Sequence, residues 1–256
     1  MWFELLLLFI IFYLIYEKYK KKIRIKLSRN NIKICNVEDV NEVFLPLNKN
    51  DLLSPKQNVM VNFFCTPSNF NVVGMTSDYE AWILSVLAKN SRNIFEFGTC
   101  SGKTTLLFAM NSPEDAKIDT ITLDEATAKA IAPNLNDNKI AQRNIINKSK
   151  YNQFMFTGTN YEKKINTIFK DSKLLDISKI KNKYDLIFID GGHTYSCIKN
   201  DTEKSLEMIK RGGYILWHDF SIGKNSHKDV YRYLNEISKS YDVKNIKNTS
   251  LCFLQR

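Results

Sequence analysis

The chain has 256 residues, of which 44% are hydrophobic and 25% charged, and its net charge is +10. This composition excludes a disordered chain and leaves room for one α/β domain with an appendage. The sequence has no arginine cluster and no basic stripe interleaved with aromatic residues, so nucleic acid is not expected as a partner. The five cysteines lack CxxC spacing, which indicates neither a zinc site nor a disulfide framework.

Residues 1–26 predict a membrane-anchor helix with a basic flank. Leu5–Tyr16 is an uninterrupted apolar run, and six lysine and arginine residues follow it by position 26. The run is shorter than the roughly 20 residues of a typical span, but lysine side chains can extend to the interface. Positive charge after the apolar run predicts that the domain that follows faces the cytoplasm. The alternative is an apolar helix that packs on the domain or on a partner chain.

Residues 27–73 are interpreted as a connector and partial cover, with a candidate strand at Val59–Phe64, and residues 74–256 as the main domain. Expected helices cover Tyr79–Lys89, the stretch from Leu106 onward, parts of Ala126–Lys150, Tyr195–Lys210 and Asp229–Ser240. Expected strands cover residues 93–97, Ile118–Leu123, Ile165–Lys170, Tyr184–Ile189, Tyr214–Trp217, Val243–Ile246 and Ser250–Leu254, with Arg211-Gly212-Gly213 as a helix stop. This alternation predicts a doubly wound, mostly parallel sheet, and the short link between the last two strands predicts an antiparallel hairpin.

The stretch from Asn93 to Thr105 reads as strand, glycine turn and helix start, a junction that binds nucleotide-like ligands in open α/β sheets. A phosphate loop requires four residues between its glycines, whereas Gly98 and Gly102 enclose three. A dinucleotide fingerprint requires a middle glycine where Cys100 stands. A phosphate and a dinucleotide are therefore disfavoured as ligands. The third nucleotide-like ligand that such a junction can bind is S-adenosylmethionine.

Two acidic residues favour S-adenosylmethionine. Asp124 follows the next strand and is placed to hydrogen-bond the ribose hydroxyls. Glu96, beside the glycine turn, adds negative charge that favours a cationic sulfonium ligand and would repel a pyrophosphate.

Residues 74–256 resemble the class I S-adenosylmethionine-dependent methyltransferases, in particular the O-methyltransferase-like branch. The resemblance is carried, in order, by residues 96–105 (EFGTCSGKTT), 122–124 (TLD), 170–172 (KDS), 185–195 (DLIFIDGGHTY), 201–204 (DTEK), Gly212-Gly213 and 217–220 (WHDF). It implies a seven-stranded sheet with a terminal antiparallel hairpin.

The resemblance also implies the cofactor contacts: Glu96, Gly98, Thr99 and Gly102 for the methionine part, Asp124 for the ribose, and Asp171 with Ser172 for the adenine end. Asp190 and Asp219 take the places of the magnesium ligands of metal-dependent members. That pattern is incomplete, because Phe220 follows Asp219 where such members often carry Asp or Asn.

Methyl transfer is an in-line displacement that needs alignment of donor and acceptor and deprotonation of the acceptor. Asp190, His193 and His218 are the catalytic candidates, with base or metal assistance, although His193 could instead cap the next helix. Asp201 is expected on a solvated helix face. The expected acceptor is a hydroxyl of a small molecule, sugar or lipid-linked compound, and the oligomeric state is open, with a dimer as one option. The alternatives are a P-loop-like nucleotide-dependent enzyme and a methyltransferase-like binding domain.

Overall fold

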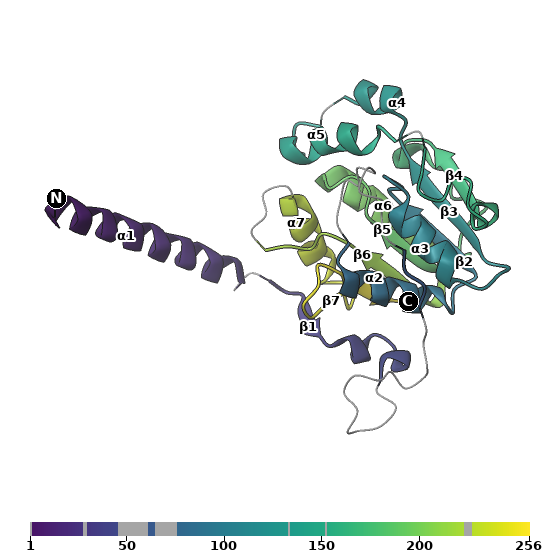
Figure 1. Cartoon of the computed structure of the whole chain (residues 1–256), viewed down its shortest axis with the longest axis horizontal. Coiled ribbons are helices and arrows are strands. Elements are labelled where there is room, and N and C mark those ends of the chain that lie inside the picture. The colour runs from purple at the N-terminus through teal and green to yellow at the C-terminus, as the bar shows by residue number, and fades with distance from the viewer. Residues whose placement is uncertain are drawn as a thin grey trace.

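The computed structural model describes residues 2–27, 30–45, 61–64, 76–132, 134–151, 153–222 and 227–256. Within these ranges eight strands form one sheet in the order β1-β7-β8-β6-β5-β2-β3-β4, and Figure 1 shows the helices around it. The strands are β1 (Lys33–Cys35), β2 (Asn93–Phe97), β3 (Lys117–Thr122), β4 (Ile165–Phe169), β5 (Tyr184–Ile189), β6 (Ile209–Trp217), β7 (Lys244–Ile246) and β8 (Cys252–Gln255). The helices are α1 (Trp2–Leu27), α2 (Asp78–Ala88), α3 (Lys103–Asn111), α4 (Glu125–Ala130), α5 (Lys139–Lys148), α6 (Tyr195–Met208) and α7 (Lys228–Ile237).

The sheet changes direction between β2 and β5. From β2, strands β3 and β4 follow on one side, and β5 and β6 on the other. All pairs among these five strands are parallel, whereas β8 is antiparallel to both β6 and β7. The doubly wound sheet and its antiparallel C-terminal pair are thus confirmed. The carboxyl ends of β2 and β5 meet at the topological switch point, where open α/β sheets bind ligands.

The predicted count of seven strands is wrong, because β1 adds an eighth. This strand comes from the segment interpreted as a connector and pairs in parallel with β7, from Lys33 opposite Lys244 to Cys35 opposite Ile246. A three-residue strand shows too little alternation to be found in a sequence. The candidate strand at Val59–Phe64 is not confirmed: residues 59–60 lie outside the described ranges, and residues 61–64 have no regular structure.

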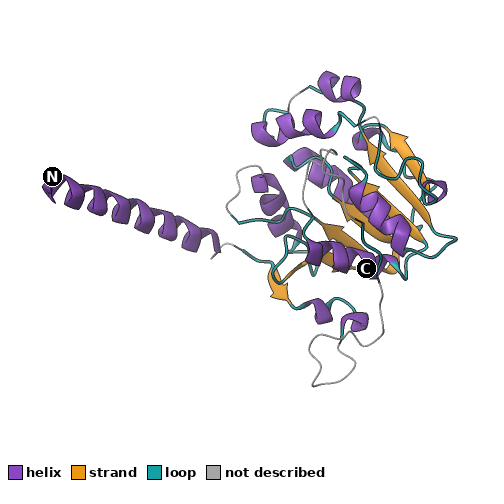
Figure 2. Cartoon of the chain, viewed as in Figure 1, coloured by secondary structure: helices purple, strands orange, loops and turns teal. Residues whose placement is uncertain are grey.

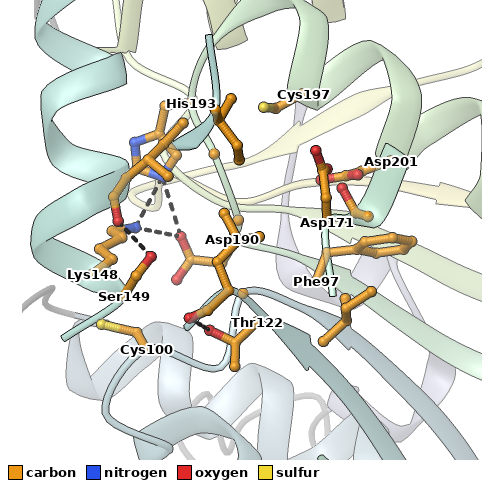
Figure 3. Close-up of a pocket in the computed structure, with 18 of the residues that line it drawn as sticks. Phe97, Cys100, Thr122, Lys148, Ser149, Asp171, Asp190, His193, Cys197 and Asp201 are labelled. Atoms are coloured by element: carbon orange, nitrogen blue, oxygen red, sulfur yellow. Dashed lines mark hydrogen bonds and ion pairs between the residues drawn. The ribbon is translucent and has the colours of Figure 1, made fainter. Parts of the chain in front are cut away.

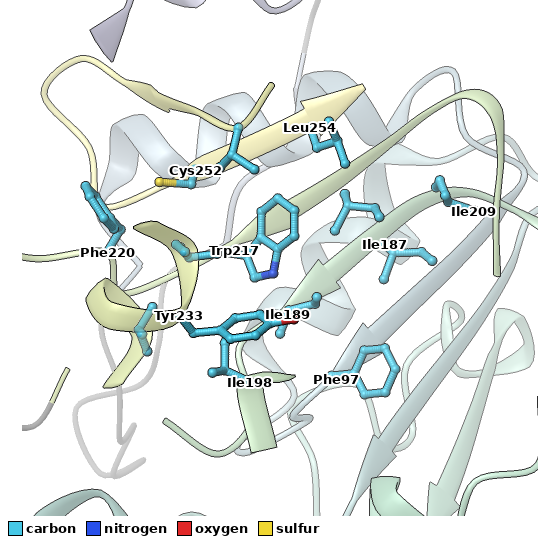
Figure 4. Packing of buried hydrophobic residues seen from close by; sticks show 14 of the residues in the cluster. Phe97, Ile187, Ile189, Ile198, Ile209, Trp217, Phe220, Tyr233, Cys252 and Leu254 are labelled. Carbon is cyan, nitrogen blue, oxygen red and sulfur yellow. The ribbon is translucent and has the colours of Figure 1, made fainter. Parts of the chain in front are cut away.

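Successive side chains of the central strands fill two apolar layers, one on each face of the sheet. In β5, Ile187 and Ile189 pack in the layer that includes α6 and α7, whereas Leu186 and Phe188 pack in the layer with α2 and α3. Figure 2 shows the helices on both sides of the sheet, and Figure 4 shows the α6–α7 layer around Trp217. Burial on both faces explains why these strands are continuous apolar runs in the sequence.

Strand β6 begins at Ile209, directly after α6, and not at Tyr214 as predicted. Its register with β5 shifts between Tyr184 and Leu186, and Arg211-Gly212-Gly213 lies within the strand at this irregularity. The glycine pair therefore lies in an irregular part of the strand and does not end the helix.

Helix α1 forms where the N-terminal helix was predicted, and Figure 1 shows it extending away from the sheet. Side chains along it are exposed, with Phe9 at 79% and Phe12 at 73%. However, no helix in the described ranges is long and apolar enough to cross a membrane. The predicted membrane anchor, and the membrane-anchored localisation with a cytoplasmic domain, are therefore wrong. The physical reason is that Glu4 and Glu17-Lys18 bound an apolar run shorter than the roughly 20 residues of a span.

Trp217 provides a test of the α6–β6 packing. Its side chain is fully buried, and Nε1 donates a hydrogen bond of 2.8 Å to Thr202 Oγ1 on α6. We expect Trp217→Ala to lower the free energy of unfolding by about 3–5 kcal/mol, because it leaves a cavity in the core. Trp217→Phe should lower it by about 1–3 kcal/mol, since the Thr202 hydroxyl then loses its donor. Urea unfolding followed by circular dichroism measures both, and a loss in Trp217→Ala no larger than in Trp217→Phe would contradict this account.

Candidate functional site

The glycine turn after β2 is built against the end of β5. Gly98 has a φ of +102°, and a Cβ atom there would lie 2.4 Å from the carbonyl oxygen of Asp190. Only glycine fits a backbone approach this close. Gly102 has a φ of +79° and is the N-cap residue before α3, and its N–H donates to the Thr99 carbonyl at 2.7 Å. The turn is therefore compact and holds the two strand ends together.

Backbone hydrogen bonds continue the sheet into the loops that follow the strands. The Asp190 N–H donates to the Phe97 carbonyl at 2.9 Å, and the His218 N–H donates to the Ile189 carbonyl at 3.1 Å. These bonds place Asp190 and His218-Asp219 side by side at one edge of the sheet, as expected for parallel strands.

A cavity opens at this edge, and Figure 3 shows its lining. Five of the predicted site residues line it: Gly98, Asp171, Ser172, Asp190 and His193. Apolar side chains from β3, α5 and the segment after α4 form much of the remaining wall, namely Ile121, Ile131, Ala141 and Ile145. The cavity thus has an apolar interior with polar groups at both ends.

Thr99 lines a smaller cavity beside the turn, together with Asp190 and Lys148. Asp124 lies outside both cavities, although Thr122 and Leu123 before it line the main one. Its carboxylate is exposed and caps α4 by accepting from the Thr127 N–H at 2.8 Å.

Glu96 does not line the cavity, contrary to the expectation that its charge faces the cofactor. Its side chain is 1% exposed and accepts hydrogen bonds from the hydroxyls of Thr105 and Thr120. Burial, with a smaller contribution from the charge of Asp190, raises the pKa of Glu96 to about 8. Glu96 therefore acts as a neutral link between β2, β3 and α3.

Histidine and aspartate side chains converge beside the cavity. His193 Nε2 lies 3.0 Å from Asp219 Oδ2 and 3.4 Å from Asp190 Oδ1. His218 Nδ1 lies 3.5 Å from Asp190 Oδ1 and 3.6 Å from Asp219 Oδ2, and its Nε2 lies 3.5 Å from Glu80 Oε2. The predicted residues Asp190, His193, His218 and Asp219 are thus brought together.

Charge compensation within this cluster shifts its pKa values. Burial opposes the charged form of His218, but the carboxylate of Asp190, with those of Asp219 and Glu80, raises the pKa of His218 to about 12. Burial likewise disfavours the Asp190 carboxylate, yet the Lys148 ammonium and the His218 ring hold the pKa of Asp190 well below its usual value. His218 is therefore a poor proton acceptor, because its ring is already charged at neutral pH.

The residues at Asp190 and Asp219 fit magnesium poorly. The donor next to both carboxylates is the imidazole of His218, whereas Mg²⁺ takes octahedral oxygen ligands. The Lys148 ammonium, 3.6 Å from Asp190 Oδ1, also offsets the negative charge on which magnesium binding depends. No chemical step is assigned to magnesium.

The structure adds residues that the sequence did not indicate. Lys148, at the end of α5, lies 3.2 Å from His193 Nε2 and lines both cavities. Asp201 is 2% exposed, not solvated as expected, and burial raises its pKa to about 6. Glu80 of α2 is 4% exposed and contacts His218. The contacts of Lys148 and Glu80 join distant parts of the chain, so no local pattern could reveal them. Asp201 lies on the buried face of α6 with Thr202 and Ser205, and these polar residues give no amphipathic signal in the sequence.

Comparisons with known proteins agree with this geometry. Residues 95–220 match a family model described as a methyltransferase domain. A putative caffeoyl-CoA O-methyltransferase from Staphylococcus aureus is 18% identical, with a TM-score of 0.51 over 72% of this chain and 86% of that one. The O-methyltransferase TomG from Streptomyces achromogenes, described in complex with SAM, is 15% identical, with a TM-score of 0.45 over 71% and 81%. No curated protein matches.

The chain therefore carries a methyltransferase domain over residues 95–220 and has the class I S-adenosylmethionine-dependent methyltransferase fold. The resemblance to O-methyltransferases and the prediction of a methyltransferase are confirmed.

Glu96→Gln tests whether Glu96 is protonated in the folded protein. Because the pKa of Glu96 is raised from 4.5 to about 8, its stabilising effect is complete below about pH 4.5 and is lost as the pH rises toward 8. The wild-type free energy of unfolding should therefore fall across this window, by at most about 1.4 kcal/mol per pH unit from this group. Glu96→Gln should show a flatter profile in urea unfolding, whereas the exposed-site control Glu125→Gln should follow the wild type. Equal slopes in all three proteins would refute the assignment.

Proposed function

We propose that the protein transfers the methyl group of S-adenosylmethionine to a hydroxyl of a small-molecule acceptor. The observation that carries this proposal is the cavity at the β2–β5 switch point, closed by the Gly98 turn at one end and by Asp171-Ser172 at the other. The methyltransferase domain matched over residues 95–220 supports the reaction class. We further propose residues 74–256 as the methyltransferase unit, residues 27–73 as a connector that contributes β1, and residues 1–26 as a separate N-terminal helix.

The residues at the two ends of the cavity would hold the methyl donor. Asp190 and Lys148, beside the turn at Gly98, would supply one charge of each sign for the amine and the carboxylate of its methionine end. Ile121, Ile131 and Ile145 would contact its adenine, with Asp171 and Ser172 as polar partners. Apolar walls with a few polar groups are typical of cofactor sites. Asp124 remains a prediction for the ribose, because its neighbours line the cavity while its carboxylate caps α4.

The reaction forms one bond and breaks one. The acceptor oxygen attacks the methyl carbon in line with the sulfur, the carbon–sulfur bond breaks, and S-adenosylhomocysteine leaves. The acceptor hydroxyl gives up its proton to a base. We assign this role to His193, which lines the cavity, whereas the charge on His218 excludes that ring. Asp219 at 3.0 Å from His193 Nε2 orients the ring and stabilises its protonated form.

Lys148 has a complementary role in this scheme. Burial opposes its charge, but the carboxylates of Asp190 and Asp219 outweigh that effect and raise the pKa of Lys148. The side chain therefore stays an ammonium at the cavity wall, where it is available to the carboxylate of the donor.

No observation favours a P-loop-like enzyme. Lys103, the lysine after the turn, donates from Nζ to the Thr76 carbonyl at 3.2 Å. The spacing of Gly98 and Gly102 is also one residue shorter than in a phosphate loop.

Asp171→Ala tests the donor site, and Asp176→Ala is a matched control. Both carboxylates accept a hydrogen bond of 2.9 Å from the N–H two residues ahead, but only Asp171 lines the cavity. In calorimetry we expect Asp171→Ala to weaken binding of S-adenosylmethionine about tenfold or more, as for loss of a hydrogen bond to a charged group. Asp176→Ala should stay close to the wild type. Binding of ATP without binding of S-adenosylmethionine would overturn the proposed function.

His193→Gln tests the proposed base. Loss of general-base catalysis should reduce methyl transfer by about 10²–10⁴-fold, while the affinity for S-adenosylmethionine measured on the same variant stays near that of the wild type. The assay follows a radiolabelled methyl group into a panel of phenols, free sugars and lipid-linked sugars. Wild-type turnover in His193→Gln would exclude His193 as the base, and parallel loss of donor affinity would make it a binding residue.

A further inference from the structure

Asp201 is a buried acid at the end of the cavity that Asp171 and Ser172 close. It belongs to α6, is only 2% exposed and lines the cavity, and Figure 3 shows it next to Asp171. A carboxylate is rarely buried to this extent without partners that stabilise it. The partners of Asp201 therefore indicate what this side chain does.

The side chains of Asn200 and Ser172 are hydrogen-bond partners of Asp201. Asn200 Nδ2 donates to Asp201 Oδ1 at 2.9 Å and also approaches Ser172 Oγ at 3.4 Å. Burial raises the pKa of Asp201 to about 6, whereas hydrogen bonds from the Ser172 hydroxyl and from Asn200 oppose this rise by favouring the carboxylate. Asp201 is thus mainly ionised at neutral pH, where it can accept hydrogen bonds but cannot donate one.

These contacts fix the direction of the hydrogen bond that Ser172 can form with a ligand. A serine hydroxyl has one proton and two acceptor lone pairs. The proton of Ser172 is directed to Asp201, and Asn200 approaches its oxygen as a donor. Ser172 therefore presents a lone pair to the cavity, and a ligand group next to it must be a hydrogen-bond donor.

The backbone around Ser172 is held by the same helix. Lys204 Nζ donates to the carbonyl of Ser172 and to those of Lys173 and Leu175, the last two at 3.0 and 2.9 Å. Both the backbone and the hydroxyl of Ser172 are thus bound to α6. A fixed acceptor of this kind discriminates between ligands, because a partner that lacks the donor leaves it unpaired.

We propose that Asp201 is a positioning residue that makes Ser172 an acceptor for the 6-amino group of the donor's adenine, so that the site selects a 6-aminopurine over a 6-oxopurine. The inference rests on the proposed function, in which Asp171 and Ser172 are the polar partners of the adenine. A 6-oxopurine places a carbonyl oxygen where the amino group would lie. Two acceptors then face each other without a proton between them, which should lower the affinity about tenfold or more.

The test compares two nucleosides that differ in this group. S-adenosylhomocysteine is the product of the proposed reaction, and S-inosylhomocysteine carries a 6-oxo group in place of its 6-amino group. Calorimetry with the full-length wild type should show an affinity for S-adenosylhomocysteine about tenfold or more above that for S-inosylhomocysteine. A wild-type ratio near one would overturn the proposal.

Asp201→Ala frees the Ser172 hydroxyl to rotate and to donate to the 6-oxo group. The ratio of the two affinities should therefore fall about threefold or more, mainly through tighter binding of S-inosylhomocysteine. A merely structural role of Asp201 would instead weaken both nucleosides by the same factor, and that result would overturn the proposal. If melting followed by circular dichroism shows that Asp201→Ala does not fold, Asp201→Asn replaces it. This variant keeps the volume, and its amide can donate to Ser172 as well as accept from it, so the ratio should fall here too.

Two further variants act as controls. Ser172→Ala removes the acceptor, so adding Asp201→Ala in a double-mutant cycle should change the ratio no further. Lys204→Met loosens the backbone of the segment but leaves Ser172 and Asp201 in place, so it should weaken both nucleosides equally. An effect of Asp201→Ala on the ratio that persists without the Ser172 hydroxyl would show that Asp201 does not act through Ser172 and would overturn the assignment.

Failure of this inference is distinguishable from failure of the proposed function. A wild-type protein that binds neither nucleoside would contradict both. A wild-type protein that binds S-adenosylhomocysteine, with a ratio that does not depend on Asp201, would contradict the role of Asp201 and leave the proposed methyl transfer intact.

Discussion

The close approach of the Gly98 backbone to the Asp190 carbonyl is the constraint on which the site depends. A Cβ at Gly98 would lie 2.4 Å from that oxygen, so any other residue would force the ends of β2 and β5 apart. The turn and the loop after β5 form one cavity wall only while the ends of β2 and β5 stay this close. It also fixes Asp190, whose N–H is bonded to the Phe97 carbonyl. Catalytic and binding groups on such rigid strand ends keep their geometry because the sheet below them is packed on both faces.

Charge pairing, not exposure, defines the chemistry at this edge. Asp190 is compensated by Lys148 and His218, and Glu80 approaches His218 from the opposite side. Each of these groups comes from a different element, so the cluster exists only when α2, α5 and the ends of β5 and β6 are assembled. The charge on His218 leaves His193 as the proposed proton acceptor at the cavity, where its Nε2 lies 3.0 Å from Asp219 Oδ2 and 3.2 Å from Lys148 Nζ. The proposed base therefore follows from this charge pairing.

Local sequence signals were sufficient for the central sheet and for one edge of the site. The apolar run Tyr184–Ile189 and the turn at Gly98 are each formed by consecutive residues. The strand and the turn could therefore be predicted, and so could the positions of Asp190 and His193 after the strand. Glu96 was also identified, but its role was not: burial raises its pKa and keeps it neutral, and it accepts hydrogen bonds from the hydroxyls of Thr105 and Thr120. Strand β1 escaped detection because it is three residues long and depends on pairing with β7.

The sequence by itself determined the order of the strands and helices from β2 onward, the glycine turn and the class of fold, because each rests on residues adjacent in the chain. Its prediction of a membrane anchor was wrong, because no helix in the described residues is long and apolar enough to cross a membrane. Only the tertiary structure decided that Lys148 and Glu80 belong to the site, that Asp201 is buried, and that His218 stands between carboxylates. Those facts depend on burial and on contacts between residues far apart in the chain, and such contacts leave no periodic pattern in a sequence.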